Sequence, residues 1–240
     1  MTRRPELRQN VIPALLVTFA FAIFARSIGG ITTSGAAAGF LVTCVLFIAG
    51  GRGMFGVVLL VFVLTYLATR FGRRRKRQLA IAERASGRDG AQVLANVGLA
   101  ALAAALAYLT PWRVPLLTGS IAALAEAACD TVSSESGKAL AQNARVITSW
   151  RKVPAGADGA ISLPGTLLGI AAAVLVGGEA VATKLLDVRL AVIATIAGAL
   201  GMLFDSLLGA TLERRGWLTN NAVNLISTAF AVLLASLLAT

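Results

Sequence analysis

The strongest constraint on this chain is the recurrence of long apolar segments along almost all of its 240 residues. A helix needs roughly 20 apolar residues to cross a bilayer. Hydrophobic residues make up 57% of the chain and charged residues only 14%, whereas a soluble domain carries about 25% charged residues. We therefore expect an all-α protein, a polytopic transmembrane helical bundle that forms one membrane domain over residues 1–240. The expected spans, seven to eight in number, lie near 11–25, 31–50, 53–71, 91–110, 117–134, 164–180, 189–207 and 221–240.

The first segment is short, contains Pro13 and follows several arginines, a pattern that it shares with secretory signal peptides. We interpret it as a retained membrane segment because further spans follow at once. Glycines four residues apart, at Gly35 and Gly39 and again at Gly165 and Gly169, predict close packing between helices.

Basic residues predict the orientation of the bundle. The chain has 22 Lys and Arg against 11 Asp and Glu, a net charge of +11. Because basic residues concentrate in cytoplasmic loops, we place the basic loop near 72–90 in the cytoplasm, with the protein in a bacterial inner membrane. Eight crossings then bring Arg26, the 138–152 loop and the pair 214–215 to the same side. The basic run comprises Arg70, Arg73, Arg74, Arg75, Lys76, Arg77, Arg84 and Arg88.

This topology leaves Arg3, Arg4 and Arg8 on the outer side, a conflict that a re-entrant or interfacial first segment would remove. The excess of positive charge in a membrane protein indicates anionic lipid head groups and phosphates as partners, and not a nucleic acid.

Several chemistries are excluded by composition. The chain has no histidine, so Ser-His-Asp triads and histidine metal sites are ruled out. Its two cysteines, Cys44 and Cys129, each lie within an apolar run. They are expected to be small core residues, because they form neither a disulfide framework nor a zinc-binding spacing.

Acidic residues lie in or beside the apolar segments. Glu126, Asp130 and Glu135 fall within or just after the fifth segment, and Asp205 near the end of the seventh. A carboxylate inside the bilayer costs roughly 2.5–3.5 kcal/mol, so each is a candidate functional residue. The predicted topology brings Asp130, Asp205 and Asp158 to the cytoplasmic face. We therefore predict one polar site there.

On an ideal helix Glu126 and Asp130 share a face with the hydroxyls of Ser133 and Ser134. Glu135 lies about 140° away from Asp130 around the same helix. Both Glu135 and Asp130 serve one site only if the helix breaks in the Ser/Gly-rich stretch that follows.

The site loop, near 135–163, is rich in turn residues and contains Asp158. Its backbone amides and the Ser162 hydroxyl, at the start of the next segment, favour anion binding at a helix N-terminus. Asp205 precedes Ser206 and nearby glycines, which repeats the pairing of an acid with a hydroxyl.

Carboxylates and hydroxyls flanked by basic residues suit a phosphate held by Mg²⁺, which is usually bound through one or two carboxylates, waters and substrate phosphates. Phosphoryl transfer depends on positioning and charge neutralisation, so it does not require histidine. No Walker A motif surrounds Lys138.

Five motifs in a consistent order then resemble one family. It is the integral-membrane family that includes the plant and cyanobacterial phytyl-phosphate kinases and the animal transmembrane protein nineteen, much of it long known as a domain of unknown function. The resemblance runs from about Arg88 to the C-terminus and is looser over the first three segments. The motifs are Arg88-Asp-Gly-Ala-Gln-Val-Leu-Ala-Asn96, Asp130-Thr-Val-Ser-Ser-Glu135, Val153-Pro-Ala-Gly-Ala-Asp158-Gly-Ala-Ile-Ser162, Asp205-Ser-Leu-Leu-Gly-Ala-Thr211 and Leu218-Thr-Asn220-Asn221-Ala-Val-Asn224.

The resemblance implies a Mg²⁺-dependent kinase that uses CTP, or another nucleoside triphosphate, to convert phytyl or geranylgeranyl monophosphate to the diphosphate. It implies that the catalytic and metal-binding residues are Asp130, Glu135, Asp158 and Asp205. The candidate substrate- and nucleotide-binding residues are Ser133, Ser134, Lys138, Gly159, Ser162, Ser206, Asn220, Asn224, Gln92 and Asn96.

Three positions depart from the family pattern. Asn221 stands where an acid is expected, Ser227 where asparagine is expected, and Glu213 where glutamine is frequent. The change at Asn221 removes a candidate metal ligand. Gln92 and Asn96 have an alternative role as hydrogen-bond partners between helices.

Two other functions are compatible with the acids: an ion-coupled transporter or lipid flippase, and a non-catalytic membrane scaffold. The expected partners are the bilayer, a prenyl phosphate and a nucleotide; association with a second copy of the chain stays open.

Overall fold

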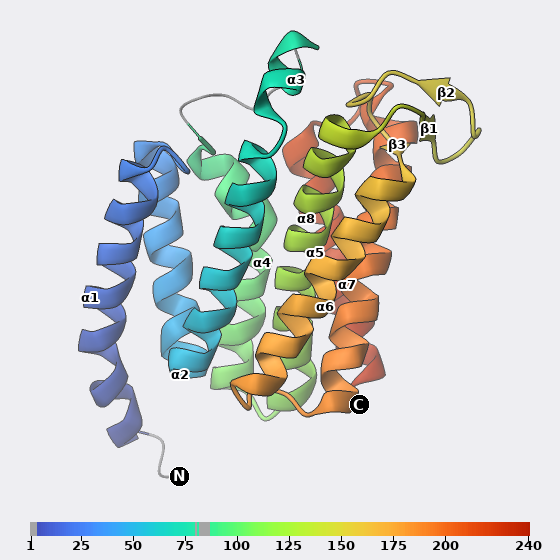
Figure 1. Ribbon diagram of the computed structural model, residues 1–240. Coiled ribbons are helices and arrows are strands. Elements are labelled where there is room, and N and C mark those ends of the chain that lie inside the picture. Colours follow the sequence, from blue (N-terminus) through green and yellow to red (C-terminus); the bar gives the residue numbers. More distant parts are fainter. Residues whose placement is uncertain (1–3, 80, 82–86) are drawn as a thin grey trace.

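A computed structural model describes residues 4–79, 81 and 87–240, with side chains from Val11 onward. The predictions made on Arg3 and Arg84, and on the side chains of Arg4 and Arg8, lie outside the described residues. The chain forms the expected helical bundle, whose helices run between the two ends of the molecule (Figure 1). Its helices are α1 (Arg4–Ser27), α2 (Thr33–Arg70), α3 (Arg73–Gln78), α4 (Gly90–Leu109), α5 (Arg113–Leu140), α6 (Leu163–Ala182), α7 (Val188–Leu208), the π-helix η1 (Gly209–Glu213) and α8 (Asn220–Leu238).

The helices agree with the predicted spans. In the described part of the chain, five helices are long and apolar enough to cross a membrane: α2, α4, α6, α7 with η1, and α8. Helix α1 adds a shorter apolar stretch, Val11–Ser27. Helix α2 has 38 residues, and Gly51 interrupts it with φ 67° and ψ −155°. Its two halves therefore correspond to two separately predicted spans.

Helix α5 forms the centre of the bundle, where it packs against α2, α4, α6, α7 and α8. Its residues from Leu117 to Cys129 are all buried. Helix α5 has 28 residues and contains three acids, Glu126, Asp130 and Glu135, and it is not among the five apolar helices. The polar residues of α5 are thus held within a shell of other helices.

The predicted small-residue packing is confirmed on α6. A Cβ atom added to Gly165 or Gly169 would lie 2.6 Å from the carbonyl oxygen of Ser133 or Cys129. These glycines therefore allow α6 to lie directly against the backbone of α5.

The same prediction is wrong at Gly39. A Cβ atom added there would have only the Ile31 side chain nearby, at 3.9 Å. Gly39 borders a cavity, so its neighbour is open space and not a packed helix.

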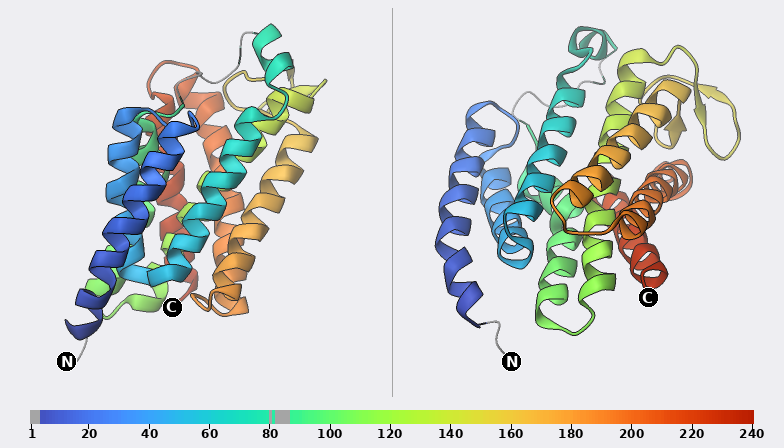
Figure 2. Two further views of the ribbon diagram at one scale, coloured as in Figure 1. Left: turned by 60° about the vertical axis from the view of Figure 1, so that its left-hand side comes forward. Right: turned by 60° about the horizontal axis from the view of Figure 1, so that its bottom comes forward.

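The site loop contains a small antiparallel sheet that the sequence did not predict. Its strands are β1 (Ala144–Val146), β2 (Lys152–Val153) and β3 (Ala160–Ile161), in the order β2-β1-β3. Arg145 pairs with Lys152 on one side and with Ile161 on the other. The sheet lies over one end of α5 and α6 (Figures 1 and 2).

The predicted clustering of positive charge is confirmed for the described residues. The end of α1, helix α3, the sheet and the α7–α8 connection all lie at one end of the bundle, which we call the basic end (Figures 1 and 2). Helix α1 begins, and α8 ends, at the opposite end. The first predicted segment thus belongs to a helix that runs along the bundle beside α2.

Candidate functional site

A polar cavity of about 300 Å³ lies at the basic end, between α5, the end of α7 with η1, the start of α8 and the site loop. We call it the acidic cavity, because the described residues that line it include four carboxylates and one lysine. Such a cavity attracts cations and repels an unaccompanied phosphate. Its charged and polar side chains are Asp130, Asp158, Asp205, Glu213, Lys138, Ser133, Ser134, Ser162, Ser206 and Asn220.

Helix α5 supplies one wall. Asp130, Ser133, Ser134 and Lys138 line the cavity because residues three or four positions apart share a helix face. Arg88 and Lys138 both lie near enough to Asp130 for their positive charges to interact with its carboxylate. Asp130, Ser133 and Ser134 of the predicted face therefore border the cavity, whereas Glu126 of the same face does not.

The loop that carries Asp158 reaches the cavity through a close contact between glycines. Gly159 has φ 67°, a backbone conformation that favours glycine. A Cβ atom on Gly209 would lie 2.9 Å from the Gly159 nitrogen, and a side chain at Gly159 would collide with Ala210. The Gly159 carbonyl also accepts a hydrogen bond from the Ile147 N–H at 3.1 Å. These contacts bring Asp158 to the end of α7.

Helix α7 and its π-helical extension supply Asp205, Ser206 and Glu213. Short π-helical segments occur frequently at functional sites. The Ser227 hydroxyl of α8 lies 3.2 Å from Asp205 Oδ2 and 2.7 Å from Glu126 Oε1. Since a hydroxyl has one proton to donate, Ser227 bridges the two acids but cannot donate to both at once.

Glu126 lies deeper in the bundle and is only 2% exposed. Its second oxygen accepts a hydrogen bond from the Thr228 hydroxyl at 2.9 Å. Glu126 does not line the acidic cavity but connects to it through Ser227 and Asp205.

The structure does not bring Glu135 to the cavity. Helix α5 is continuous to Leu140, so the helix break that would have allowed Glu135 and Asp130 to share a site is absent, and that expectation is wrong. Glu135 instead accepts hydrogen bonds from Lys76 at 2.6 Å and from Lys138 at 2.9 Å. It therefore pairs with two lysines and not with the other acids.

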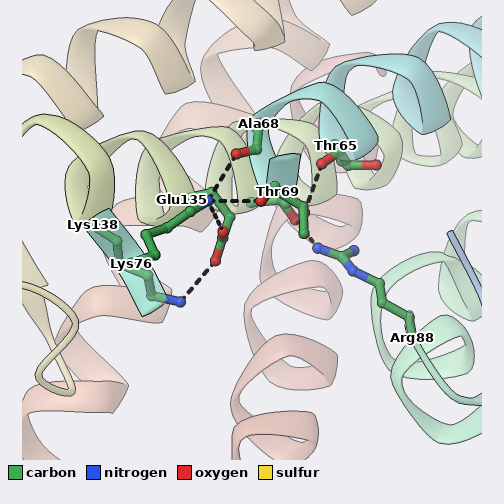
Figure 3. Close-up of polar contacts among 8 residues, drawn as sticks. Thr65, Ala68, Thr69, Lys76, Arg88, Glu135 and Lys138 are labelled. Atoms are coloured by element: carbon green, nitrogen blue, oxygen red, sulfur yellow. Dashed lines mark hydrogen bonds and ion pairs between the residues drawn. The ribbon is translucent and has the colours of Figure 1, made fainter. Parts of the chain in front are cut away.

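Lys76 is fully buried and anchors this arrangement. Its ammonium group donates to the carbonyl oxygens of Ala68 at 3.1 Å and Thr69 at 2.8 Å, as well as to Glu135 (Figure 3). We call the three charged residues, Lys76, Glu135 and Lys138, the lysine clamp. The clamp joins the end of α2 to α5 and holds Lys138 at the edge of the acidic cavity.

Three more predicted residues lie outside the lining of the acidic cavity. Gln92 and Asp89 form a capping box at the start of α4, with both hydrogen bonds at 2.9 Å. Asn96 donates to the Gln92 carbonyl at 2.8 Å and lines a different cavity. Asn224 is not among the lining residues, whereas Asn220, one turn earlier, is.

Ser162 has a local structural role in addition to its place in the lining. Its hydroxyl accepts a hydrogen bond from the Gly165 N–H at 3.3 Å and caps α6. The predicted anion site at this helix N-terminus is therefore partly filled by the helix's own cap.

Two residues of this region were not predicted as site residues. Glu213 was noted only as a departure from the family pattern, although an acid two turns after Asp205 was a usable signal. Lys76 was interpreted as part of a basic run that faces lipid head groups. It is the only lysine in that run of arginines, and its compact ammonium fits a small set of oxygen acceptors.

The carboxylates of the acidic cavity suit a divalent cation that is also coordinated by a phosphate. Among the described residues, no three Asp, Glu or Cys side chains group closely enough to hold a metal by themselves. Mg²⁺ needs only one or two protein carboxylates when phosphates and waters complete its coordination. Asp130, Asp158, Asp205 and Glu213 all border one cavity, so such a shared site is compatible with the geometry.

The fold and the cavity define an integral membrane helical protein with a cluster of acids at one end of the bundle. The chain belongs to the family described as integral membrane protein DUF92, whose model matches residues 16–232. This membership confirms the family resemblance that the five motifs indicated.

Relatives occur in bacteria and plants. An uncharacterized membrane protein of Synechocystis is 37% identical over 186 residues, which cover 75% of this chain and 70% of that protein. Protein PGR of Arabidopsis thaliana is 33% identical over 245 residues, with 90% and 83% covered. Protein VTE6, chloroplastic, of the same plant is 29% identical over 219 residues, which cover 87% of this chain and 65% of VTE6. No solved structure matches the chain.

Proposed function

We propose that this protein is an isoprenyl-phosphate kinase. It transfers a phosphoryl group from a nucleoside triphosphate, CTP by family resemblance, to phytyl or geranylgeranyl monophosphate and yields the diphosphate. The observation that carries the proposal is the convergence of Asp130, Asp158 and Asp205, from three distant stretches of the chain, in one cavity. The family relationship to Protein VTE6 supports the same proposal.

The chemistry needs no general base. A phosphate monoester carries about −1.5 to −2 charges at neutral pH, so its own oxygen serves as the nucleophile. That oxygen forms a bond to the terminal phosphorus of the nucleotide as the bond to the leaving nucleoside diphosphate breaks. The protein must therefore position two anions and neutralise their charge.

The residues of the acidic cavity divide this work. A divalent cation, held by one or two of the carboxylates of Asp130, Asp158 and Asp205, would offset the charge of the nucleotide phosphates. Lys138 adds a positive charge, and the lysine clamp keeps its ammonium 2.9 Å from Glu135. Hydroxyls of Ser133, Ser134 and Ser206 donate to phosphate oxygens.

The proposal places the acidic cavity in the cytoplasm of a bacterial cell. The basic end of the bundle carries the cavity, and basic residues favour the cytoplasmic side of a membrane. Nucleoside triphosphates are available on that side.

The direct test is product formation by the purified protein in detergent. Phytyl and geranylgeranyl monophosphate are incubated with Mg²⁺ and each nucleoside triphosphate in turn, and the prenyl diphosphate is measured by mass spectrometry. We expect diphosphate with CTP, no product after chelation of the metal, and recovery when Mg²⁺ is restored. Absence of diphosphate with every nucleotide would reject the kinase function.

The buried link from Glu126 through Ser227 to Asp205 favours a second candidate, an ion-coupled transporter or lipid flippase. Acids inside a bundle commonly serve as proton or cation sites. This function predicts lipid movement coupled to an ion gradient in sealed vesicles without nucleotide consumption, which the kinase does not.

A further inference from the structure

A second cavity, of about 140 Å³, lies between α1, both halves of α2, α4 and α5. Its walls are mostly apolar and include Phe21, Val58, Phe62, Val97 and Leu124. Helices α1 and α2 lie on the side of α5 away from α7 (Figure 1). Because one water needs roughly 10–15 Å³ of such a cavity, this space holds much more than a single solvent molecule.

The cavity is charged at one end only. Its basic side chains are Arg70, Arg73 and Arg88, which lie where α2 ends, where α3 begins and just before α4. All three therefore belong to the basic end. Val58 lies three turns before Arg70 on α2, roughly 18 Å deeper by the helical rise. The cavity thus has a cationic mouth and an apolar interior, so we call it the arginine cavity.

Two of the arginines are fixed by contacts that leave most of their donors unused. Arg70 donates to the Ile28 carbonyl at 2.7 Å and lies 4.7 Å from the centre of the Tyr66 ring. Arg88 donates to the Thr131 hydroxyl at 3.0 Å. A guanidinium has five N–H donors, and within the described chain each of these arginines uses one.

The backbone holds Arg88 in place. Its N–H donates to the Gly30 carbonyl at 3.2 Å, and its carbonyl accepts from the Thr32 N–H at 2.9 Å. Gly87, with φ 81°, packs so closely that an added side chain would collide with the Gly30 carbonyl. The cationic mouth is thereby preorganised, which favours binding of an anion.

We propose that the arginine cavity binds the acceptor lipid, with its isoprenyl chain among the apolar walls and its phosphate at Arg70, Arg73 and Arg88. This inference rests on the proposed kinase function. A single-chain amphiphile with a dianionic head matches a narrow apolar cavity with three cations at its mouth, and guanidinium groups bind phosphate through paired hydrogen bonds. Arg88 also contacts Thr131, the neighbour of Asp130, so the bound phosphate would lie towards the acidic cavity.

The first test uses two glycines in comparable open surroundings. Gly39 lines the cavity, and a Cβ atom there would meet only Ile31 at 3.9 Å; Gly178 of α6 has nothing within 4 Å and lies outside the cavity. Binding of radiolabelled geranylgeranyl monophosphate is measured without nucleotide. We expect Gly39→Leu to raise the Kd about tenfold or more, because the added side chain fills the cavity, and Gly178→Leu to bind like the wild type.

The second test uses adjacent arginines and does not depend on cavity filling. Arg73 lines the cavity, and its side chain forms no hydrogen bond or ion pair with another described residue, whereas Arg74 is exposed and not part of the lining. We expect Arg73→Gln to raise the Kd about threefold to tenfold, since a charged hydrogen bond to the phosphate is lost, and Arg74→Gln to leave it unchanged. Geranylgeraniol, which lacks the phosphate, should compete poorly.

The outcomes separate this inference from the kinase proposal. Wild-type binding by Gly39→Leu and Arg73→Gln, in folded protein, would overturn the inference even if diphosphate is formed. Tighter binding of two-chain phosphatidic acid than of the prenyl phosphate would overturn it as well. Binding of prenyl phosphate that depends on Gly39 and Arg73, without diphosphate formation, would support the site and reject the kinase.

Discussion

The two cavities of this protein border the same central helix but carry opposite charge. The acidic cavity is lined by Asp130, Ser134 and Lys138 of α5, whereas the arginine cavity is lined by Leu124 and Ala127 of the same helix. The first attracts cations and the second attracts anions. The lysine clamp lies between them, because Lys76 binds the end of α2 while Lys138 borders the acidic cavity. One helix thus borders two binding environments of opposite charge.

The largest effect is expected at the acidic cavity. Asp205→Asn should lower diphosphate formation by about 100-fold or more, because a charged group near the reacting phosphates is removed. Asp187, at the other end of α7, caps the helix through a hydrogen bond to Leu190 N–H at 2.8 Å, and asparagine caps equally well. Asp187→Asn should therefore keep wild-type activity.

Both variants are compared by initial rates at saturating substrates, with helical content checked by circular dichroism. Prenyl-phosphate binding without nucleotide should persist in Asp205→Asn. Equal rates for the two variants would remove Asp205 from the site and end the distinction between the cavities.

The next largest effect is expected at the lysine clamp, where a substitution should lower the stability of the folded protein. Lys76→Met removes one partner of a buried ion pair in which the two side chains are 1% and 5% exposed. Loss of one partner of such a pair lowers the free energy of unfolding by up to about 3–5 kcal/mol. Because Lys138 still neutralises Glu135, we expect a decrease of about 2 kcal/mol. The free energy of unfolding is measured by titration with a denaturing detergent.

Arg74→Met is the matched control, since Arg74 is exposed on the same short helix. Its effect should stay within about 0.5 kcal/mol, as is usual for surface substitutions. A Lys76→Met protein as stable as this control would show that the clamp does not fasten α2 to α5.

The smallest effect is expected at Glu213, the fourth acid of the acidic cavity. Glu213→Gln keeps the shape of the side chain, and glutamine is frequent at this position by the family resemblance. We expect the rate to fall only about threefold and the Mg²⁺ concentration for half-maximal rate to rise, because one of four carboxylates is neutralised. A loss as large as that of Asp205→Asn would instead make Glu213 a principal ligand.

Much of the acidic cavity was predictable from the chain. The spacing of Asp130, Ser133 and Ser134 identified one helix face, and the placement of basic residues indicated that Asp158 and Asp205 reach the same end. The prediction that Glu135 shares this cavity is wrong, because Glu135 reaches the cavity only if α5 breaks. A Ser/Gly-rich stretch permits such a break, but packing against Gly165 and Gly169 of α6 keeps the helix straight.

The sequence by itself determined the spanning segments, the basic end and which residues share each helix face, because hydropathy and helical periodicity are local properties of the chain. Only the tertiary structure decided that Gly159 meets Gly209 and so brings Asp158 beside Glu213. It also decided that Lys76 turns inward to Glu135 and that Asn96 borders the arginine cavity. These outcomes depend on which faces of distant helices pack together, and that is set by the shapes of several segments at once.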